Sequence, residues 1–165
     1  MSAFLERIDP PARIWIFGGG HVAAALAPVL VGLDFQVIVV DERAEWADPA
    51  RFPAAVTVRD TDPQDLLRRE SPRPTDHALV VTHDHGLDET LIRLLAPHPL
   101  AWLGLVGSRG KWARFRRRLE ARDLDPAALD RVRCPVGADI GAVTPAEIAV
   151  SIAADLVAHR HKVSP

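Results

Sequence analysis

The sequence predicts an α/β fold of the Rossmann type, with a doubly wound and mostly parallel sheet of about six strands. Three observations predict it. Short apolar runs alternate with longer helical patterns along the whole chain. The run at residues 35–40 is apolar at every position except Gln36, as in strands that are buried on both faces of a parallel sheet. The first strand also leads directly into a glycine-rich loop that opens a helix, a turn that binds phosphate in this fold.

Each element follows from its own pattern of apolar and turn-forming residues. We expect strands at residues 13–17, 35–40, 54–58, 77–82, 100–106 and 132–134. We expect helices at residues 21–31, 63–70, 87–95 and 111–122, and a last helix opened by the capping box at residues 144–147. Right-handed connections then give the strand order 3-2-1-4-5-6. We expect one domain at residues 13–165, preceded by an N-terminal extension at residues 1–12.

Composition restricts the function classes. The net charge of −2 gives no general attraction to nucleic acid or to a membrane surface. The chain has 18 Arg but two Lys, a bias typical of a GC-rich genome, so arginine abundance by itself says little about function. The single cysteine excludes an internal disulfide framework. No segment has the roughly 18 uncharged apolar residues of a membrane span, so we expect a cytoplasmic protein without nucleic-acid or membrane partners.

The loop after the first strand reads G-x-G-x-x-A, from Gly18 to Ala23. Gly18 allows the tight turn out of the strand, and Ala23 lets the helix lie close to the sheet. Gly20 has no Cβ, so a pyrophosphate can approach the backbone amides of residues 18–20 at the positive end of the helix. The alternative is a glycine turn that packs a strand against a helix and binds nothing.

A carboxylate stands where a ribose-binding acid is expected, because Asp41 follows Ala23 by 18 residues at the end of the second strand. An acid here favours a free 2′-hydroxyl and repels a 2′-phosphate, which favours NAD-like ligands over NADP. Arg43 lies two residues further on and partly reverses that preference.

Three more polar loops, at residues 82–86, 107–111 and 137–141, follow strands and should converge on the same crevice. His83 and His85 lie on one side of an extended segment and invite a metal interpretation. The simpler interpretation is that Asp84 caps the following helix and the histidines are solvated. We therefore assign no metal-binding residues.

The helix after Ser108 is strongly cationic, with a core stripe expected at Trp112, Phe115 and Leu119. We expect Arg109 and Lys111 to hold an anionic ligand, whereas the outer arginines form a solvated face or meet an acidic partner. Cys134 is expected to be a buried and inert thiol, with binding of a soft metal such as molybdenum or copper as the alternative.

Several motifs together resemble one family. They are I-F-G-G-G-H-V-A, D-E-R, R-F-P, V-V-T-H-D-H-G-L-D, G-L-V-G-S-R-G-K and C-P-V-G-A-D-I-G-A-V-T-P-A-E-I-A-V-S-I. The chain is similar over residues 13–159 to the C-terminal Rossmann domain of the XdhC/CoxI family, the xanthine dehydrogenase accessory proteins. The resemblance implies a maturation factor that binds molybdenum cofactor (molybdopterin), protects it while its terminal sulfur is added, and transfers it to a molybdenum hydroxylase apoenzyme.

The loops and the resemblance together give the candidate cofactor-binding residues: Gly18, Gly19, Gly20, His21, Asp41, Arg43, Thr82, His83, Asp84, Gly107, Ser108 and Arg109. The expected ligand is molybdenum cofactor or an NAD(P)-like dinucleotide. Family members that resemble this chain carry an additional N-terminal domain with a cysteine motif, which residues 1–11 cannot form. We therefore expect a separate polypeptide of that type as a partner, or a stand-alone role, and a homodimer as the assembly.

Two other function classes stay open. An NAD(P)-dependent oxidoreductase would lack a Tyr-Lys hydride site, since the chain has no Tyr, although His83 or His85 remains available as a general acid. A nucleotide-sensing regulatory module would change its assembly when ligand binds. Catalytic residues are not assigned, and a non-catalytic accessory protein is the favoured interpretation.

Overall fold

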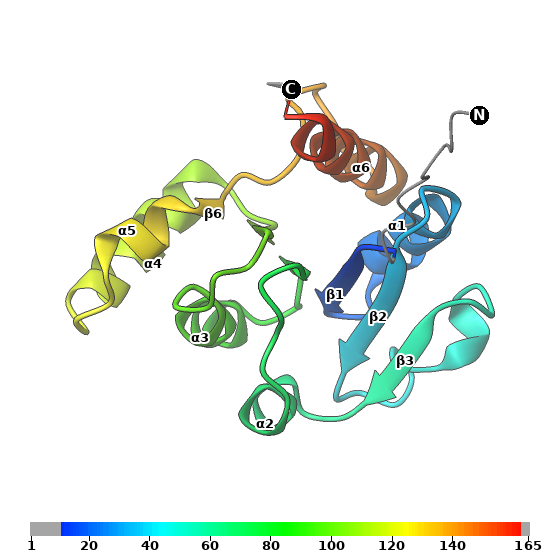
Figure 1. Cartoon of the computed structure of the whole chain (residues 1–165), viewed down its shortest axis with the longest axis horizontal. Coiled ribbons are helices and arrows are strands. Elements are labelled where there is room, and N and C mark those ends of the chain that lie inside the picture. The colour runs from blue at the N-terminus through cyan, green and yellow to red at the C-terminus, as the bar shows by residue number, and fades with distance from the viewer. Residues whose placement is uncertain (1–10, 163–165) are drawn as a thin grey trace, which may run out of the picture.

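The computed structural model describes residues 11–162, which form a six-stranded sheet (Figure 1). Its strands are β1 (Arg13–Phe17), β2 (Gln36–Asp41), β3 (Thr57–Asp60), β4 (His77–Val80), β5 (Trp102–Leu105) and β6 (Val132–Arg133). Every pairing is parallel, and the order is β3-β2-β1-β4-β5-β6. The predicted fold class and strand order are confirmed. The N-terminal extension predicted at residues 1–12 lies almost entirely outside the described residues.

The helices form two layers around the sheet (Figure 1). They are α1 (His21–Gly32), α2 (Pro63–Arg69), α3 (His85–Leu95), α4 (Arg109–Glu120), α5 (Pro126–Asp130) and α6 (Pro145–His161), with a 3-10 turn, η1 (Pro49–Arg51). Helices α1 and α6 pack together on one face, and α2, α3, α4 and α5 contribute to the apolar core on the other. None of the helices in this part of the chain has both the length and the apolar character that crossing a bilayer requires.

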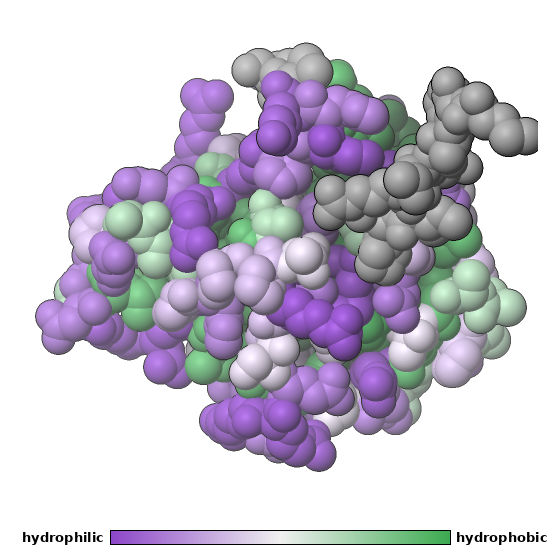
Figure 2. Space-filling view, in the orientation of Figure 1, coloured by the Kyte–Doolittle hydropathy of each residue, from purple (hydrophilic) through white to green (hydrophobic). Residues whose placement is uncertain are grey.

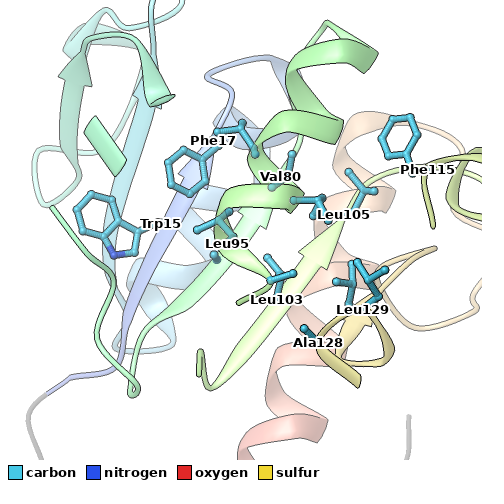
Figure 3. Close-up of a cluster of buried hydrophobic side chains, with 14 of the residues drawn as sticks. Trp15, Phe17, Val80, Leu95, Leu103, Leu105, Phe115, Ala128 and Leu129 are labelled. Atoms are coloured by element: carbon cyan, nitrogen blue, oxygen red, sulfur yellow. The ribbon is translucent and has the colours of Figure 1, made fainter. Parts of the chain in front are cut away.

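The strands are buried on both faces because their alternating side chains enter two separate apolar cores. Ile14 and Ile16 pack toward α1 and α6, whereas Trp15 and Phe17 enter the opposite core (Figure 3). The apolar side chains are collected inside, and hydrophilic residues predominate on the face seen in Figure 2.

The starts of the helices explain where the element boundaries differ from those predicted. Asp84 accepts a hydrogen bond from the Leu87 amide, so α3 begins at His85. Ser108 accepts one from the Lys111 amide, so α4 begins at Arg109. The capping box predicted at residues 144–147 is present at the start of α6. Helix α5 and turn η1 were not predicted, because both are short and each begins at the proline of an Asp-Pro pair whose Asp is the N-cap.

His77 is a titratable group inside the core. It is 8% exposed, packs edge-to-face against Phe35, and lies 5.9 Å from the His159 ring. Burial lowers the pKa of His77, and the positive charges of His159 and Arg160 lower it further. The folded protein therefore holds this imidazole neutral at pH values where the unfolded chain protonates it.

Replacing His77 with Leu should reduce the loss of unfolding free energy that the wild type shows as the pH falls. The unfolded chain binds a proton near pH 6.5 that the fold resists, so wild-type stability falls as pH drops below that value, by up to about 1.4 kcal/mol per pH unit for one proton. Urea unfolding at a series of pH values from about 7.5 to about 5, on both sides of the pKa of the unfolded chain, measures how steeply the free energy of unfolding depends on pH. The exposed His161→Leu variant should keep the wild-type slope, and an unchanged slope in His77→Leu would refute the assignment.

Candidate functional site

The candidate site lies at the carboxyl edge of the sheet, between β1 and β4, where the strand order reverses. The loop after β1 contacts the loop after β4 directly, since a Cβ on Gly18 would lie 2.4 Å from the Val81 carbonyl oxygen. A small depression here is lined by eight residues: Gly18, Val40, Asp41, Glu42, Pro63, Thr82, His83 and Leu87. The fold therefore brings together four of the candidate cofactor-binding residues, which come from three different strand ends.

The glycine loop presents one open side. Gly18 has a φ of 113°, and its amide donates to the Val40 carbonyl, which fixes the turn out of β1. Gly20 is the N-cap of α1, and within the described chain no side chain caps this helix. A Cβ built on Gly20 would meet nothing within 4 Å. The first-turn amides of α1 are therefore accessible for an anion on the Gly20 side of the loop.

Asp41 is engaged within the chain and does not present a free carboxylate. It is 4% exposed and accepts hydrogen bonds from the Gly19 amide at 2.8 Å and from Arg43 Nε and Nη2 at 2.9 and 2.8 Å. Burial by itself would raise the pKa of Asp41, but these hydrogen bonds and the Arg43 charge hold it below its ordinary value. A ribose hydroxyl can reach this carboxylate only if Arg43 moves aside.

The segment after β2 covers the other side of the glycine loop, a feature that the sequence did not assign to the site. The Trp46 carbonyl packs against Gly19, where a Cβ would approach its oxygen to 2.4 Å. Arg51 Nη1 donates to the Gly19 and Trp46 carbonyls at 2.5 and 3.0 Å, and its guanidinium lies 4.5 Å from the Trp46 ring centre. The His21 ring meets Trp46 edge-on at 5.2 Å. The R-F-P motif was the only sequence signal for this contact.

The loop after β4 is held mainly by its own hydrogen bonds. Asp84 caps α3, which confirms the simpler interpretation of this residue. Thr82 Oγ1 donates to Asp88 Oδ1 at 2.7 Å, and the Thr82 amide donates to the same oxygen at 3.1 Å. His83 and His85 are exposed. Across residues 11–162 there is no cluster of three or more His, Cys, Asp or Glu side chains with the arrangement of a metal site.

The Lys111 side chain is buried and paired within the chain, which is unlike the free anion-binding group expected from the sequence. It is 8% exposed, and its Nζ donates to Asp88 Oδ2 at 2.6 Å and to the Val106 carbonyl at 3.1 Å. Its aliphatic stem lies on Gly107, where a Cβ would be 2.7 Å from Lys111 Cδ. The buried Asp88–Lys111 pair therefore ties the loop after β4 to the loop after β5. Sequence patterns cannot show which buried charges pair across two helices.

Arg109, in contrast, is exposed on the first turn of α4, beside the Ser108 cap. Its role as an anion ligand stays a prediction. Two outer arginines of α4, Arg116 and Arg118, and Arg122 just after the helix lie within ion-pair distance of acids of the same molecule. The Arg116 pairs lie on a solvated helix face and add little stability, whereas Arg118 and Arg122 pair with Glu89, a buried acid that is 8% exposed. The core stripe of α4 is Lys111, Phe115 and Leu119, with Trp112 only half-buried, because Lys111 turns inward to reach Asp88.

Cys134 is half-buried, with its Sγ 3.5 Å from the Gly107 carbonyl oxygen. Burial raises the pKa of this thiol to about 11, and the negative charge of Asp88 opposes ionisation as well. Thiolate is the form that binds soft metals and reacts with electrophiles. At neutral pH Cys134 therefore stays a protonated thiol, which favours the inert interpretation over metal binding.

Iodoacetamide should alkylate Cys134 of the folded protein far more slowly than the same cysteine in urea. The thiolate fraction at pH 7.5 is small at a pKa of about 11, and the residue is only partly exposed. Intact mass spectrometry follows the single adduct with time. Modification of the folded protein at the unfolded rate would contradict the assignment.

The family of the chain follows from comparison with known proteins. The model of the XdhC Rossmann domain matches residues 14–156, which is most of the chain. The chain belongs to the XdhC family. Its sheet order, glycine loop and strand-end loops are thus those of an XdhC Rossmann domain, and the resemblance stated from the motifs is confirmed.

Relatives of this XdhC domain are longer proteins. A Bacillus subtilis (strain 168) protein, described by its name as a probable xanthine dehydrogenase subunit, is 34% identical over 99% of the chain, which corresponds to 47% of that protein. The Escherichia coli (strain K12) protein YqeB is 33% identical over 95% of the chain and 29% of its own length. A crystal structure described as a xanthine dehydrogenase from Bacillus halodurans superposes with a TM-score of 0.81 and 31% identity, over 94% of this chain and 44% of that one. The XdhC domain thus spans less than half of each of these proteins.

Proposed function

We propose that this XdhC domain is an accessory protein in the maturation of a molybdenum hydroxylase of the xanthine dehydrogenase type. It binds molybdenum cofactor, or a nucleotide, in the crevice at the carboxyl edge of the sheet. The Bacillus subtilis relative is named as a probable part of a xanthine dehydrogenase, which supports the link to that enzyme system. The proposed partners are the hydroxylase apoenzyme and an XdhC N-terminal-type protein, in the cytoplasm.

The observation that carries the proposal is the open start of α1 at Gly20. Within residues 11–162, all four other helices of at least seven residues (α2, α3, α4 and α6) follow an Asp, Ser or Thr. The side chain of that residue accepts a hydrogen bond from a backbone amide of the helix. At α1, within residues 11–162, a side-chain cap is missing and the space above Gly20 is free. A phosphate oxygen can take the place of that cap. The phosphate of molybdenum cofactor, or the pyrophosphate of a dinucleotide, therefore fits this position.

The surrounding candidate residues would contact different parts of the ligand. The amides of Gly20 and His21 would hold the phosphate, and Arg109 would add positive charge from the loop after β5. His83 is exposed beside the depression at the switch point, where it is available to donate a hydrogen bond to a ligand. When bound, molybdenum cofactor supplies the metal centre that the client enzyme uses. The chain itself would bind the cofactor, orient it and shield it from water.

A dinucleotide of the NAD(P) type is the second candidate ligand, since Asp41 stands at the ribose position of this fold. Arg43 neutralises Asp41 through two hydrogen bonds, and this weakens the charge-based preference for an unphosphorylated ribose. Both NAD and NADP are therefore appropriate probes. Binding of either with measurable oxidation of a substrate would favour an oxidoreductase over an accessory protein.

Native mass spectrometry of protein purified from a molybdenum-replete host tests the proposed function. The expected result is a bound mass equal to molybdopterin or its nucleotide form, on a protein that is dimeric. A host that cannot make molybdopterin provides the control and should yield protein without that mass. Protein that carries only a pyridine nucleotide would overturn the molybdenum-cofactor assignment in favour of the second candidate ligand, and protein that carries neither ligand would contradict the proposal.

A further inference from the structure

A second hollow lies at the amino edge of the sheet, opposite the crevice just described. It has a volume of about 340 Å³ and is bounded by the start of β5, by α5, and by His159 near the end of α6. It exists because β6 has only two residues, which pair with Leu103 and Gly104 and leave the start of β5 uncovered. A hollow of this size is large enough for a small organic molecule. We call it the β5 groove.

The walls of the β5 groove are mainly apolar. Five of its lining residues are apolar or small: Ala96, Leu100, Ala101, Leu103 and Ala128. The polar lining consists almost entirely of hydrogen-bond donors and imidazoles: His98, Trp102, Arg131, Arg133 and His159, with Asp130 as the one acid. This combination suits a ligand that has an apolar body and an accepting group at one end.

Trp102 provides an unused donor. It lines the groove and is 2% exposed, and within residues 11–162 its buried Nε1 has no hydrogen-bond partner. The indole N–H can only donate, so an acceptor group of a ligand at this position would satisfy it. His77, its register partner on β4, is also buried with an unpartnered ring nitrogen, Nδ1. Both atoms therefore lack the hydrogen bond that most buried polar groups make.

Arg131 is the group in the groove that is best placed to bind an anion. Asp130 pairs with Arg116 at 2.7 Å, although Arg116 also pairs with Glu120 at 2.7 Å, and Arg133 pairs with Asp155 at 2.7 Å. Arg131 donates from Nη2 to the Ala96 and His98 carbonyls at 2.7 and 3.3 Å, which are uncharged acceptors. Because these bonds within residues 11–162 go to carbonyls, the charge of Arg131 and its other N–H groups remain available to a carboxylate.

We propose that the β5 groove binds a small organic carboxylate. The apolar body of the ligand lies against Leu100, Leu103 and Ala128, and its carboxylate accepts hydrogen bonds from Trp102 Nε1 and Arg131. An inorganic anion would leave the apolar walls uncovered, so an aryl or alkyl carboxylate fits better. The site is separate from the glycine loop and does not depend on the function proposed for the crevice.

The indole N–H resonances of the four tryptophans in a ¹⁵N-labelled protein report directly on this site. With 3-phenylpropanoate as the probe, the Trp102 resonance should move downfield and saturate, while the other three stay in place. The neutral analogue 3-phenylpropanamide should bind at least about tenfold more weakly, since it lacks the charge. An unmoved Trp102 resonance, or equal affinity for the amide, would overturn the proposal.

Arg131→Gln should weaken binding of 3-phenylpropanoate by at least about tenfold, whereas Arg93→Gln, an exposed arginine on α3, should leave it unchanged. Trp102→Phe assigns the resonance; if that variant does not fold, cross-peaks to the His77 side chain assign it in the wild type. Wild-type affinity in Arg131→Gln would refute the site. A Gly20→Val variant should keep groove binding, which separates this site from the crevice.

Discussion

Lys111→Met is expected to lower the free energy of unfolding by about 3–5 kcal/mol, although the new side chain is only one atom shorter and more apolar. The substitution leaves the Asp88 carboxylate, 1% exposed, without the charge that lies 2.6 Å from its Oδ2. Asp88 still accepts from Thr82, so the carboxylate cannot simply turn toward solvent. Urea unfolding followed by circular dichroism measures the loss.

A double-mutant cycle identifies the cause of that loss. Asp88→Asn keeps an oxygen for the Thr82 hydrogen bonds and removes the charge, so the double variant Asp88→Asn/Lys111→Met should lose at least about 2 kcal/mol less than the sum of the single losses. Additive losses, or a Lys111→Met loss under about 1 kcal/mol, would show that the pair does not tie the two loops together.

Gly18→Ala is expected to destabilise the domain by about 3–5 kcal/mol or to prevent folding. The residue has a φ of 113°, and a Cβ would lie 2.4 Å from the Val81 carbonyl oxygen and 3.0 Å from Thr82 Cα. Both obstacles are backbone atoms of the neighbouring loop, so relief requires β1 and β4 to separate. Strained φ values and overpacking each cost about 1–3 kcal/mol.

Gly32→Ala is the matched control for Gly18→Ala. Gly32 ends α1, and a Cβ there would meet nothing within 4 Å. Alanine is the better helix former, so this variant should be neutral or more stable by up to about 1 kcal/mol. Thermal unfolding of both variants makes the comparison. Equal stability of the two would contradict the contact between the loops.

Most of the fold was predictable because parallel strands buried on both faces are uniformly apolar. The prediction for β1 at residues 13–17 was confirmed to the residue. The strand predicted at residues 77–82 ends at Val80, since the Thr82 amide leaves the sheet to bond Asp88. The strand predicted at residues 54–58 starts at Thr57, because the Val56 amide closes a turn on the Pro53 carbonyl. Local hydrogen bonds of this kind do not alter the alternation of apolar residues, so the sequence pattern does not reveal them.

The site was predictable only in part. The position of Gly18, Asp41, Thr82 and His83 around one depression follows from the rule that parallel strands end at the same edge. The state of each side chain does not follow from that rule. Asp41 binds Arg43, Lys111 binds Asp88, and Arg51 closes over Gly19. These pairings depend on how close the loops lie in the folded protein, and the order of residues along the chain does not give those distances.

The glycine loop is tested most directly by isothermal titration of molybdenum cofactor (anaerobically), NAD and NADP into the wild type, Gly20→Val and Gly32→Ala. Gly20 has a φ of −68° and open space around its Cα, so Gly20→Val should fold, at a cost of about 1 kcal/mol. We predict that at least one ligand binds the wild type and Gly32→Ala alike, and that Gly20→Val loses at least about a hundredfold in affinity. Undiminished binding by Gly20→Val, or no binding of any of the three ligands by the wild type, would contradict the role of the loop as an anion site.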